Sequence, residues 1–414
     1  MNVSVRPYKE WVHFSMNFYS LFLLVTYIPD IAGIDNLLIR NLFWLVRLML
    51  ACWILLHQHQ TAFHFNAVQK LYLVVCIIYI VNIFIDVYLD PNYFVMGRTD
   101  GKMDLLGFIL NIILALTFRY DETFDSKNSF NFFWISLAVG LLLAFHFARL
   151  TPRMLLFDED TTRYDANSTV NTIGYGQSGC AMCLVSVYGF LIHKKLTYKL
   201  IFLAMLALGF MSIVKAGSRS PVVVFVLVMA FYLISRLGKI KGFILFASFI
   251  TLFVLFINPI QDLLHSLGSN IGDRLINIVV NRDTSGREEI WKNVIGIIGD
   301  SPIFGAYYLV PSGEGGGMYP HNFYLEVFMA TGLLGGIPFM ILIFYTLGKT
   351  YNLLRLQHSS TWILLLYLQI IIFGFFSTGL YSSQECWILI FLILTIKIPD
   401  ENSAGVQSTN IANG

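Results

Sequence analysis

Long apolar runs alternate with short polar connections along almost the whole chain. The hydrocarbon core of a bilayer is about 30 Å thick, so an α-helix of about 20 apolar residues is long enough to cross it. We identify twelve such runs, at residues 14–34, 40–57, 71–89, 104–118, 130–150, 173–193, 200–214, 221–235, 241–260, 323–347, 361–378 and 385–398. The pattern therefore predicts an all-α, polytopic membrane protein with about 12 transmembrane helices and one long outward loop that carries short amphipathic helices.

Composition agrees with this class of protein. Of the 414 residues, 57% are hydrophobic and only 13% are charged, and the mean hydropathy is +0.68. A soluble domain could not bury so much apolar sequence in a core. The net charge of +2 offers no basic surface for nucleic acid, so we expect no nucleic-acid partner. All five cysteines lie within predicted helices, where we expect them to pack as small apolar side chains.

The positions of the runs divide the chain into four parts. These are a first membrane bundle of about nine helices at 1–260, a large outward loop with an amphipathic helix at 261–322, the last membrane helices at 323–398, and a disordered cytoplasmic tail at 399–414. Several connections rich in Lys and Arg fall on one side if the helices alternate, and the positive-inside rule makes that side the cytoplasm. Both termini then lie in the cytoplasm and the long loop faces outward.

A histidine stands where this loop meets the next predicted helix. Pro320, His321 and Asn322 close a polar, glycine-rich segment and directly precede the apolar run Phe323–Leu347. An imidazole at a membrane boundary stays wet enough to titrate, and its ordinary pKa suits proton transfer near neutral pH. The alternative is an interfacial histidine that only caps the helix or extends its ring to the interface.

Arginines also occur in the predicted outward connections, where the positive-inside rule predicts few of them. Arg163, Arg219 and Arg287 all lie there, and binding an anion is a reason to keep them. The alternative is that the positive-inside rule is statistical and tolerates a few outward arginines. Arg219 belongs to the turn Lys215–Pro221, in which Ser218 and a glycine let the backbone approach a ligand.

The long outward loop contains one predicted amphipathic helix. Ser285 followed by Glu288 is a capping-box pattern. An apolar stripe too short to cross a bilayer follows at helical spacing, at Ile290, Trp291, Val294, Ile295 and Ile298. Arg287 lies in the first turn, where it either binds an anion together with free backbone N–H groups or forms a surface salt bridge with Glu288 or Glu289.

Two polar segments leave their roles open. The glycine-rich stretch Gly313–Gly317 suits either a lid over a substrate or a flexible spacer. The acidic patch Asp158–Asp160 clusters oxygen ligands, but it lacks the alternating ligands and the turn glycine of a calcium loop. We expect a solvated loop there, and no metal or cofactor in this protein.

Taken in order, four motifs of the second half resemble the O-antigen polymerase and ligase family, whose members are polytopic proteins with a long outward loop. The motifs are GSRSP at 217–221, SGREEIW at 285–291, SPIFG at 301–305 and PHNFYLEVFMATGLLGG at 320–336. In the first half, the resemblance extends to the helix count and to a looser likeness in the loop from Arg163 to Gly176. One departure is that Ala306 and Tyr307 follow Gly305, where the family often has a GxG sequence.

The resemblance implies an activity at the periplasmic face of the bacterial inner membrane. The protein would polymerise undecaprenyl-diphosphate-linked oligosaccharide repeat units, which serve as donor and acceptor, with membrane lipids and a chain-length regulator as further partners. His321 would be the catalytic base. The diphosphate would bind Arg219, Arg287, Arg163 and Lys215, with Asn322, Glu326 and Ser218 in support. Asn322 could orient either the imidazole or an acceptor hydroxyl. Glu326 could hydrogen-bond to the imidazole, and packing of Glu326 against another helix fits equally well.

Other activities remain open at this stage. An O-antigen ligase, which transfers the finished polysaccharide to the lipid A core, shares the same motifs. A flippase or secondary transporter also has about twelve helices, and the intramembrane Arg47 and Asp86 could line its path or pair structurally. A metal-dependent glycosyltransferase would want acidic ligands in its first outward loop, which here is only a few residues around Asp35.

Overall fold

The computed structural model describes residues 12–32, 36–58, 65–90, 101–120, 124–150, 163–255 and 286–398, together with residues 261, 262, 266 and 272. The helices up to residue 255 are α1 (His13–Asn17), α2 (Tyr19–Val25), α3 (Ile28–Ala32), α4 (Asn36–Gln58), α5 (Ala67–Tyr88), α6 (Gly101–Thr117), α7 (Ser126–Phe147), α9 (Thr172–Ile192), α10 (Leu196–Ala216), α11 (Arg219–Leu237) and α12 (Lys239–Leu255). The helices from residue 287 onward are α15 (Arg287–Asp300), α16 (Phe323–Arg355), α17 (Thr361–Phe373) and α18 (Gln384–Thr395). Strands β1 (Arg149–Leu150) and β2 (Tyr164–Asp165) form a short antiparallel pair.

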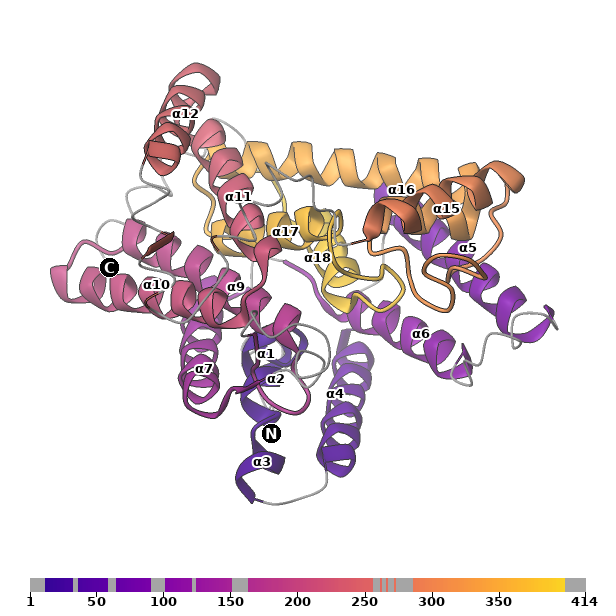
Figure 1. Cartoon of the computed structure of the whole chain (residues 1–414), viewed down its shortest axis with the longest axis horizontal. Helices are drawn as coiled ribbons and strands as arrows, with labels where there is room; N and C mark the ends of the chain where they lie inside the picture. Colours follow the sequence, from indigo (N-terminus) through magenta and orange to yellow (C-terminus); the bar gives the residue numbers. More distant parts are fainter. Residues whose placement is uncertain are drawn as a thin grey trace.

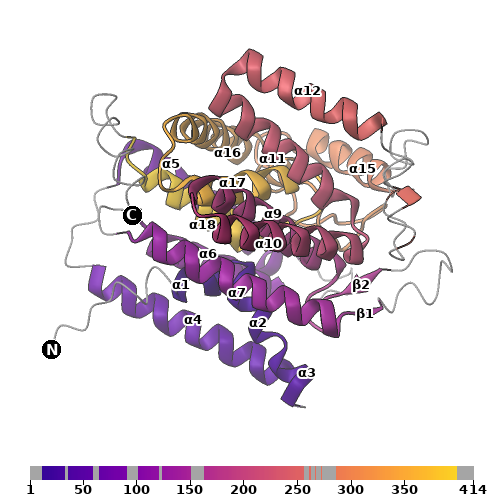
Figure 2. The same cartoon turned by 90° about the vertical axis from the view of Figure 1, so that its left-hand side faces the viewer.

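The chain is mostly helical, as the apolar runs predict, and every run coincides with helical structure. Within the described residues, six helices are long and apolar enough to cross a membrane: α5, α7, α9, α10, α11 and α16. These lengths support a polytopic membrane protein, whereas the count of twelve spans stays a prediction. Figures 1 and 2 show that the helices cross one another at wide angles instead of forming one parallel bundle.

The first predicted helix, at 14–34, is wrong as a single element. It is divided into α1, α2 and α3, because Phe18 is extended (φ −123°, ψ 158°) and the chain turns again after Val25. Pro29 lies in the first turn of α3, where its missing N–H is tolerated, but inside one continuous helix it would remove a hydrogen bond. The proline therefore favours a new helix at this point over a straight span.

The run at 361–378 is also shorter as a helix than its apolar length predicts. Helix α17 ends at Phe373, and residues 374–383, called loop 374–383 below, lead in turns to α18. A side chain at Gly374 would clash with Phe323, since an added Cβ would lie 2.3 Å from the Phe323 ring. The first residue of α16 approaches so closely that the Phe323 N–H donates to the Gly374 carbonyl over 2.7 Å. Loop 374–383 thus lies against the start of α16.

Helix α16 is interrupted at Gly332, whose backbone is not helical (φ 57°, ψ −154°). The turn of the SPIFG motif fits into this break: the Leu333 N–H donates to the Pro302 carbonyl over 2.8 Å, and the Ala306 N–H donates to the Met329 carbonyl over 2.8 Å. A Cβ on Gly332 would lie 2.4 Å from the Ile303 backbone, so only glycine allows this approach. The break holds the segment that precedes α16 against this helix.

Helix α15 forms as predicted, and its apolar stripe packs on α16. Val294 joins Val310 and Met329 in a small buried cluster. The helix begins at Arg287 with Gly286 as its N-cap, so the predicted capping box is wrong in its cap position, and Ser285 itself lies outside the described residues. The segment Gly313–Gly317 is folded against α15, because the Asn293 amide donates to the carbonyls of Ser312 and Glu314. It is therefore not an unstructured spacer, and closure as a lid stays a prediction.

Candidate active site

His321 adopts a backbone conformation that is uncommon for a residue with a side chain. Its φ is 57°, in the left-handed region, and among the described residues Gln357 is the only other non-glycine residue with a positive φ. Such conformations cost energy and occur disproportionately at functional sites. The half-buried ring packs against Tyr319, with ring centroids 4.4 Å apart. The strained turn therefore holds the imidazole against Tyr319.

The surroundings of the imidazole favour its neutral form. Burial lowers the pKa of His321, the nearby Arg287 guanidinium lowers it further, and a hydrogen bond with the Ser377 main chain opposes both effects. Nδ1 is buried without a hydrogen-bond partner in the described part of the chain. A main-chain group that raises the pKa of a histidine accepts a ring N–H, and because Nδ1 has no partner we assign this N–H to Nε2. This tautomer leaves the Nδ1 lone pair able to accept a proton.

Arg287, the first residue of α15, contacts Ser377 as well. Its Nη2 donates to the Ser377 hydroxyl over 3.2 Å. Burial lowers the pKa of Arg287, and the like charges of Arg219 and Arg163 lower it further, while Tyr319 opposes them. The surface salt bridge weighed as the alternative is not what forms, because Glu288 pairs with Lys292 at 2.9 Å. Arg287 is thus directed toward His321 and two further cations.

Arg163 and Arg219 complete this cluster of charge. Arg163 immediately precedes β2, and its Nη2 donates to the Thr172 hydroxyl over 3.4 Å. Burial lowers the pKa of Arg163, Asp165 opposes this, and Arg219 lowers the pKa further. Arg219 begins α11 next to α9, where Gly176 permits close packing, since a Cβ there would lie 2.7 Å from Pro221. Three arginines far apart in the sequence therefore act on one another, and the positive charge they gather favours an anion.

Lys215 and Ser218 lie near this region but face other partners. The Lys215 ammonium donates to the Phe145 carbonyl over 2.6 Å and lies over the rings of Phe145 and Tyr164. It points toward the end of α7, and no described contact joins it to the arginines. Ser218 is buried at the N-cap of α11 without a side-chain capping bond. Binding of the diphosphate by Lys215 stays a prediction that this geometry does not favour.

Neither Asn322 nor Glu326 contacts the imidazole, although each was a candidate to orient it. The Asn322 side-chain oxygen caps α16 by accepting the N–H groups of Tyr324 and Leu325. The fully buried Glu326 carboxylate accepts the Tyr79 hydroxyl over 2.6 Å and the N–H groups of Leu380 and Tyr381 over 2.7 and 2.9 Å. Of the two alternatives for Glu326, packing against another helix is the correct one. Sequence distance explains the miss, because Leu380 and Tyr381 follow Glu326 by more than 50 residues.

Loop 374–383 is the part of the site that the sequence does not reveal. Ser377 contacts both His321 and Arg287, and Tyr319 packs against Gly379 of the same loop. The stretch lies inside an apolar run, so hydrophobicity alone predicts helix through its first half. Its only sequence signal is the small and polar composition of residues 377–379 between two apolar segments.

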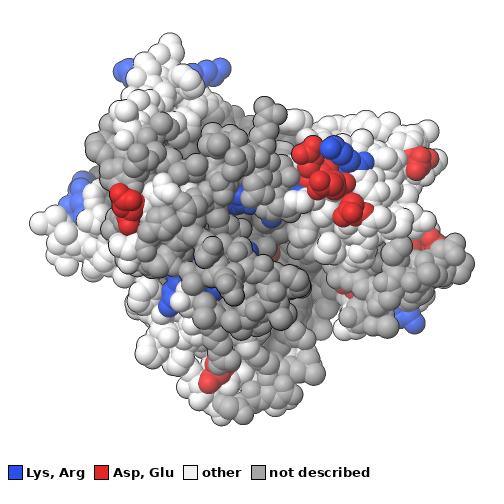
Figure 3. Space-filling view, in the orientation of Figure 1, with Lys and Arg blue, Asp and Glu red and all other residues white. Residues whose placement is uncertain are grey.

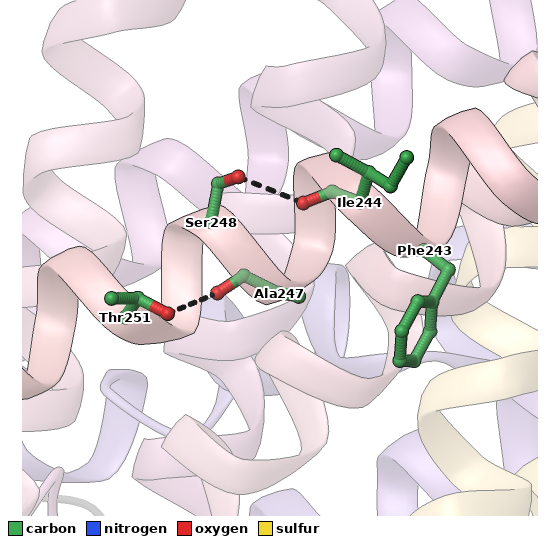
Figure 4. A pocket seen from close by; sticks show the side chains of 5 residues that line it. All are labelled: Phe243, Ile244, Ala247, Ser248 and Thr251. Atoms are coloured by element: carbon green, nitrogen blue, oxygen red, sulfur yellow. Dashed lines mark hydrogen bonds between the residues drawn. The ribbon is translucent and has the colours of Figure 1, made fainter.

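The surface around the site is uneven in charge. Figure 3 shows acidic side chains gathered over α15, where Glu288 and Glu289 are exposed, and Lys and Arg side chains nearer the centre of this face. A separate shallow hollow lies along α12 and is lined by Phe243, Ile244, Ala247, Ser248 and Thr251 (Figure 4). Its two hydroxyls donate back to carbonyls of the same helix, so we assign it no binding role.

The described residues contain no group of three His, Cys, Asp or Glu side chains that could hold a metal ion. Asp158–Asp160 lie outside these residues. Near them, Asp165 accepts the Thr172 N–H over 2.7 Å and Asn167 accepts the N–H groups of Thr169 and Val170. These two polar side chains stabilise the turn before α9.

A comparison with known families covers most of this site. Residues 203–340, from α10 to the middle of α16, match the family model described as O-antigen ligase. The matched segment contains all four motifs together with Arg219, Arg287 and His321, whereas Arg163 lies before it. No curated protein matches the chain. Residues 203–340 are therefore similar to the O-antigen ligase family, in agreement with the resemblance of the motifs.

Proposed function

We propose that this protein is a glycosyltransferase that polymerises undecaprenyl-diphosphate-linked oligosaccharide repeat units at the periplasmic face of the inner membrane. The observation that carries the proposal is the position of the His321 imidazole, whose buried Nδ1 has no partner among the described residues, beside Arg287, on which Arg219 and Arg163 act in turn. A proton acceptor next to concentrated positive charge suits a reaction in which a hydroxyl loses its proton while an anionic group departs.

His321 acts as the general base in this mechanism. A hydroxyl of the acceptor sugar attacks the anomeric carbon of the donor, and its proton passes to Nδ1. The low pKa of His321 keeps the ring in the accepting form at neutral pH. The Ser377 main chain holds Nε2, so the ring presents Nδ1 without a change of tautomer.

The arginines act on the leaving group. As the sugar–oxygen bond to the diphosphate breaks, its electron pair stays on the departing lipid diphosphate, and negative charge grows there. Arg219 and Arg287 stabilise this charge through planar, charge-assisted hydrogen bonds, with Arg163 as a third contributor. Because burial and mutual repulsion lower the pKa values of Arg163 and Arg287, binding an anion relieves an existing electrostatic cost.

The acceptor distinguishes the two family activities. A polymerase transfers the growing chain to a second lipid-linked repeat unit, whereas a ligase transfers it to the lipid A core. The PHNxxLE form of the motif at 320–326 resembles the polymerases slightly more, and the matching family model is described as O-antigen ligase. We propose polymerisation as the main activity and ligation as the alternative.

The deciding experiment measures transfer by the purified protein in lipid nanodiscs. The donor is an undecaprenyl-diphosphate-linked oligosaccharide, and each acceptor is supplied separately. We expect elongated lipid-linked product from wild type, and we expect His321→Ala to reduce the rate by about 10²- to 10⁴-fold because it removes the base. Product on the lipid A core alone would establish ligation instead.

His146→Ala is the matched control. His146 is an exposed histidine in the last turn of α7, and it makes no described contact with the arginine cluster. This variant should transfer sugar at the wild-type rate. A His321→Ala variant that inserts normally and also keeps the wild-type rate would exclude His321 as the base.

A further inference from the structure

The buried Glu326 carboxylate has no role in the mechanism above. It is fully buried at the start of α16, and its two oxygens accept three hydrogen bonds. One bond, from Tyr79, ties α16 to α5. The other two come from backbone N–H groups of loop 374–383. A buried carboxylate that accepts backbone N–H groups fixes the conformation of the chain that donates them.

The first turn of α16 holds loop 374–383 at both ends. At its beginning, the Gly374 carbonyl accepts the Phe323 N–H over 2.7 Å. Near its other end, Glu326 accepts the N–H groups of Leu380 and Tyr381. Trp387 of α18 also donates to the Leu380 carbonyl over 2.9 Å. Ser377 lies between these attachments, so its position depends on them.

Ser377 joins the two reactive elements of the site through different atoms. Its hydroxyl accepts a hydrogen bond from Arg287, and its main chain bonds to the His321 ring. The hydroxyl therefore sets the direction of a cation, whereas the main-chain carbonyl sets the tautomer of the base. These two effects can be separated, because a side-chain substitution leaves the carbonyl in place.

We propose that Glu326 and Ser377 are positioning residues: Glu326 fixes loop 374–383, and the loop, through Ser377, sets the tautomer of His321 and the direction of Arg287. The proposal rests on the proposed function for its catalytic consequence, but its structural content does not. Glu326 would then act on the base from a distance, through the backbone of loop 374–383, without contacting the imidazole.

The first test observes His321 directly, without any transfer reaction. Nuclear magnetic resonance of ¹⁵N-labelled histidine side chains, with His321→Ala to assign the signal, reports the tautomer and the titration midpoint. In wild type we expect the Nε2–H form. The charged or titratable groups that face the ring are Arg287 and Tyr319, and Tyr381 of the loop packs against Tyr319 in turn, with ring centroids 6.5 Å apart.

Three variants separate the contributions. Glu326→Gln keeps the volume but places an N–H donor against the loop, so we expect a mixture of tautomers and a midpoint closer to the ordinary value. Tyr79→Phe removes only the tie to α5 and should leave the His321 signals unchanged. Ser377→Ala keeps the carbonyl, so the tautomer should persist while binding of undecaprenyl diphosphate weakens about tenfold, as expected for one bond to a charged group.

Transfer kinetics supply the second test. For Glu326→Gln we expect kcat per folded molecule to fall on the order of 10²-fold, since small displacements of reacting groups have effects of this size. Tyr79→Phe should keep the wild-type kcat. A Glu326→Gln protein with the wild-type tautomer, midpoint and kcat would overturn the proposal and make Glu326 a structural tie alone. Wild type without transfer to either acceptor would refute the proposed function, while the resonance result would still decide the positioning role.

Discussion

Two arginines in this protein, the buried Arg47 and the half-buried Arg287, have opposite surroundings. Arg47 of α4 is almost completely buried, at 2% exposure, and its guanidinium donates to Asn17 and to Gln384 while stacking 4.3 Å from the Trp44 ring. The partners are tied to each other, because the Gln384 amide donates to the Asn17 carbonyl over 2.9 Å. This network joins α1, α4 and α18. It binds the arginine tightly and leaves its charge no outward role.

Arg287 has one described hydrogen-bond partner, Ser377, and faces two like charges. Beside it, the His321 Nδ1 has no partner in the described residues. A buried polar group without a partner costs free energy, so a protein keeps it only where something else compensates. The comparison teaches that the charge of a buried residue does not by itself indicate function. Incomplete hydrogen bonding and repulsion by neighbours are the features that indicate a ligand.

Of the variants that test this comparison, those of the arginine cluster should show the largest effect. Arg219→Ala and Arg287→Ala should each lower the transfer rate by about 10²- to 10³-fold, the usual loss when one donor to a developing charge is removed. The lysine variants should bind the lipid-linked donor better than the alanine variants yet still turn over slowly, because lysine lacks the bidentate fork. Donor binding and product per folded molecule measure the two effects. Full activity of either alanine variant would remove that arginine from the site.

Arg47 should behave in the opposite way. Arg47→Met leaves the acceptors on Asn17 and Gln384 without their donor, which should lower stability by about 1–3 kcal/mol. Transfer by the protein that remains folded should equal that of wild type. Thermal unfolding in detergent and the rate per folded molecule test this pair of expectations. Wild-type stability combined with lost transfer would instead place Arg47 in the reaction.

The sequence indicates which residues belong to the site better than it indicates which of them lie together in space. A boundary histidine and outward arginines are visible because each departs from a pattern: an ionisable group beside an apolar run, and cations against the positive-inside trend. That Arg163, Arg219 and Arg287 meet could only be proposed, since they are separated by more than 50 residues at each step. The resemblance to a family suggested their meeting, and the structure places them within electrostatic reach of one another.

Breaks in helices were the least predictable feature of the fold. The divided first run, the turn at Phe373 and the interruption at Gly332 all occur within apolar sequence, where hydropathy favours continuous helix. Their causes are tertiary: Gly374 lies against Phe323, and the SPIFG turn fits against Gly332. Such breaks free backbone groups that must find partners in the protein interior. Glu326 satisfies two of these groups, and this explains a carboxylate whose role the sequence leaves open.

The smallest expected effect is a shift in the pH dependence of kcat/KM. It tests most directly whether the Arg287 charge acts on the base. Because burial and then Arg287 lower the pKa of His321, the base stays unprotonated in wild type as the pH falls to values below 6.5, and activity declines only on further acidification. Arg287→Gln removes the charge, so the pKa should rise and the acidic decline should move to higher pH. Arg287→Lys keeps the charge and should leave the decline where it is. The pH profile of kcat/KM for the three proteins measures this, with each profile normalised to its own maximum. Equal profiles for Gln and Lys would show that the Arg287 charge does not act on the group that titrates, and a base other than His321 would then be required.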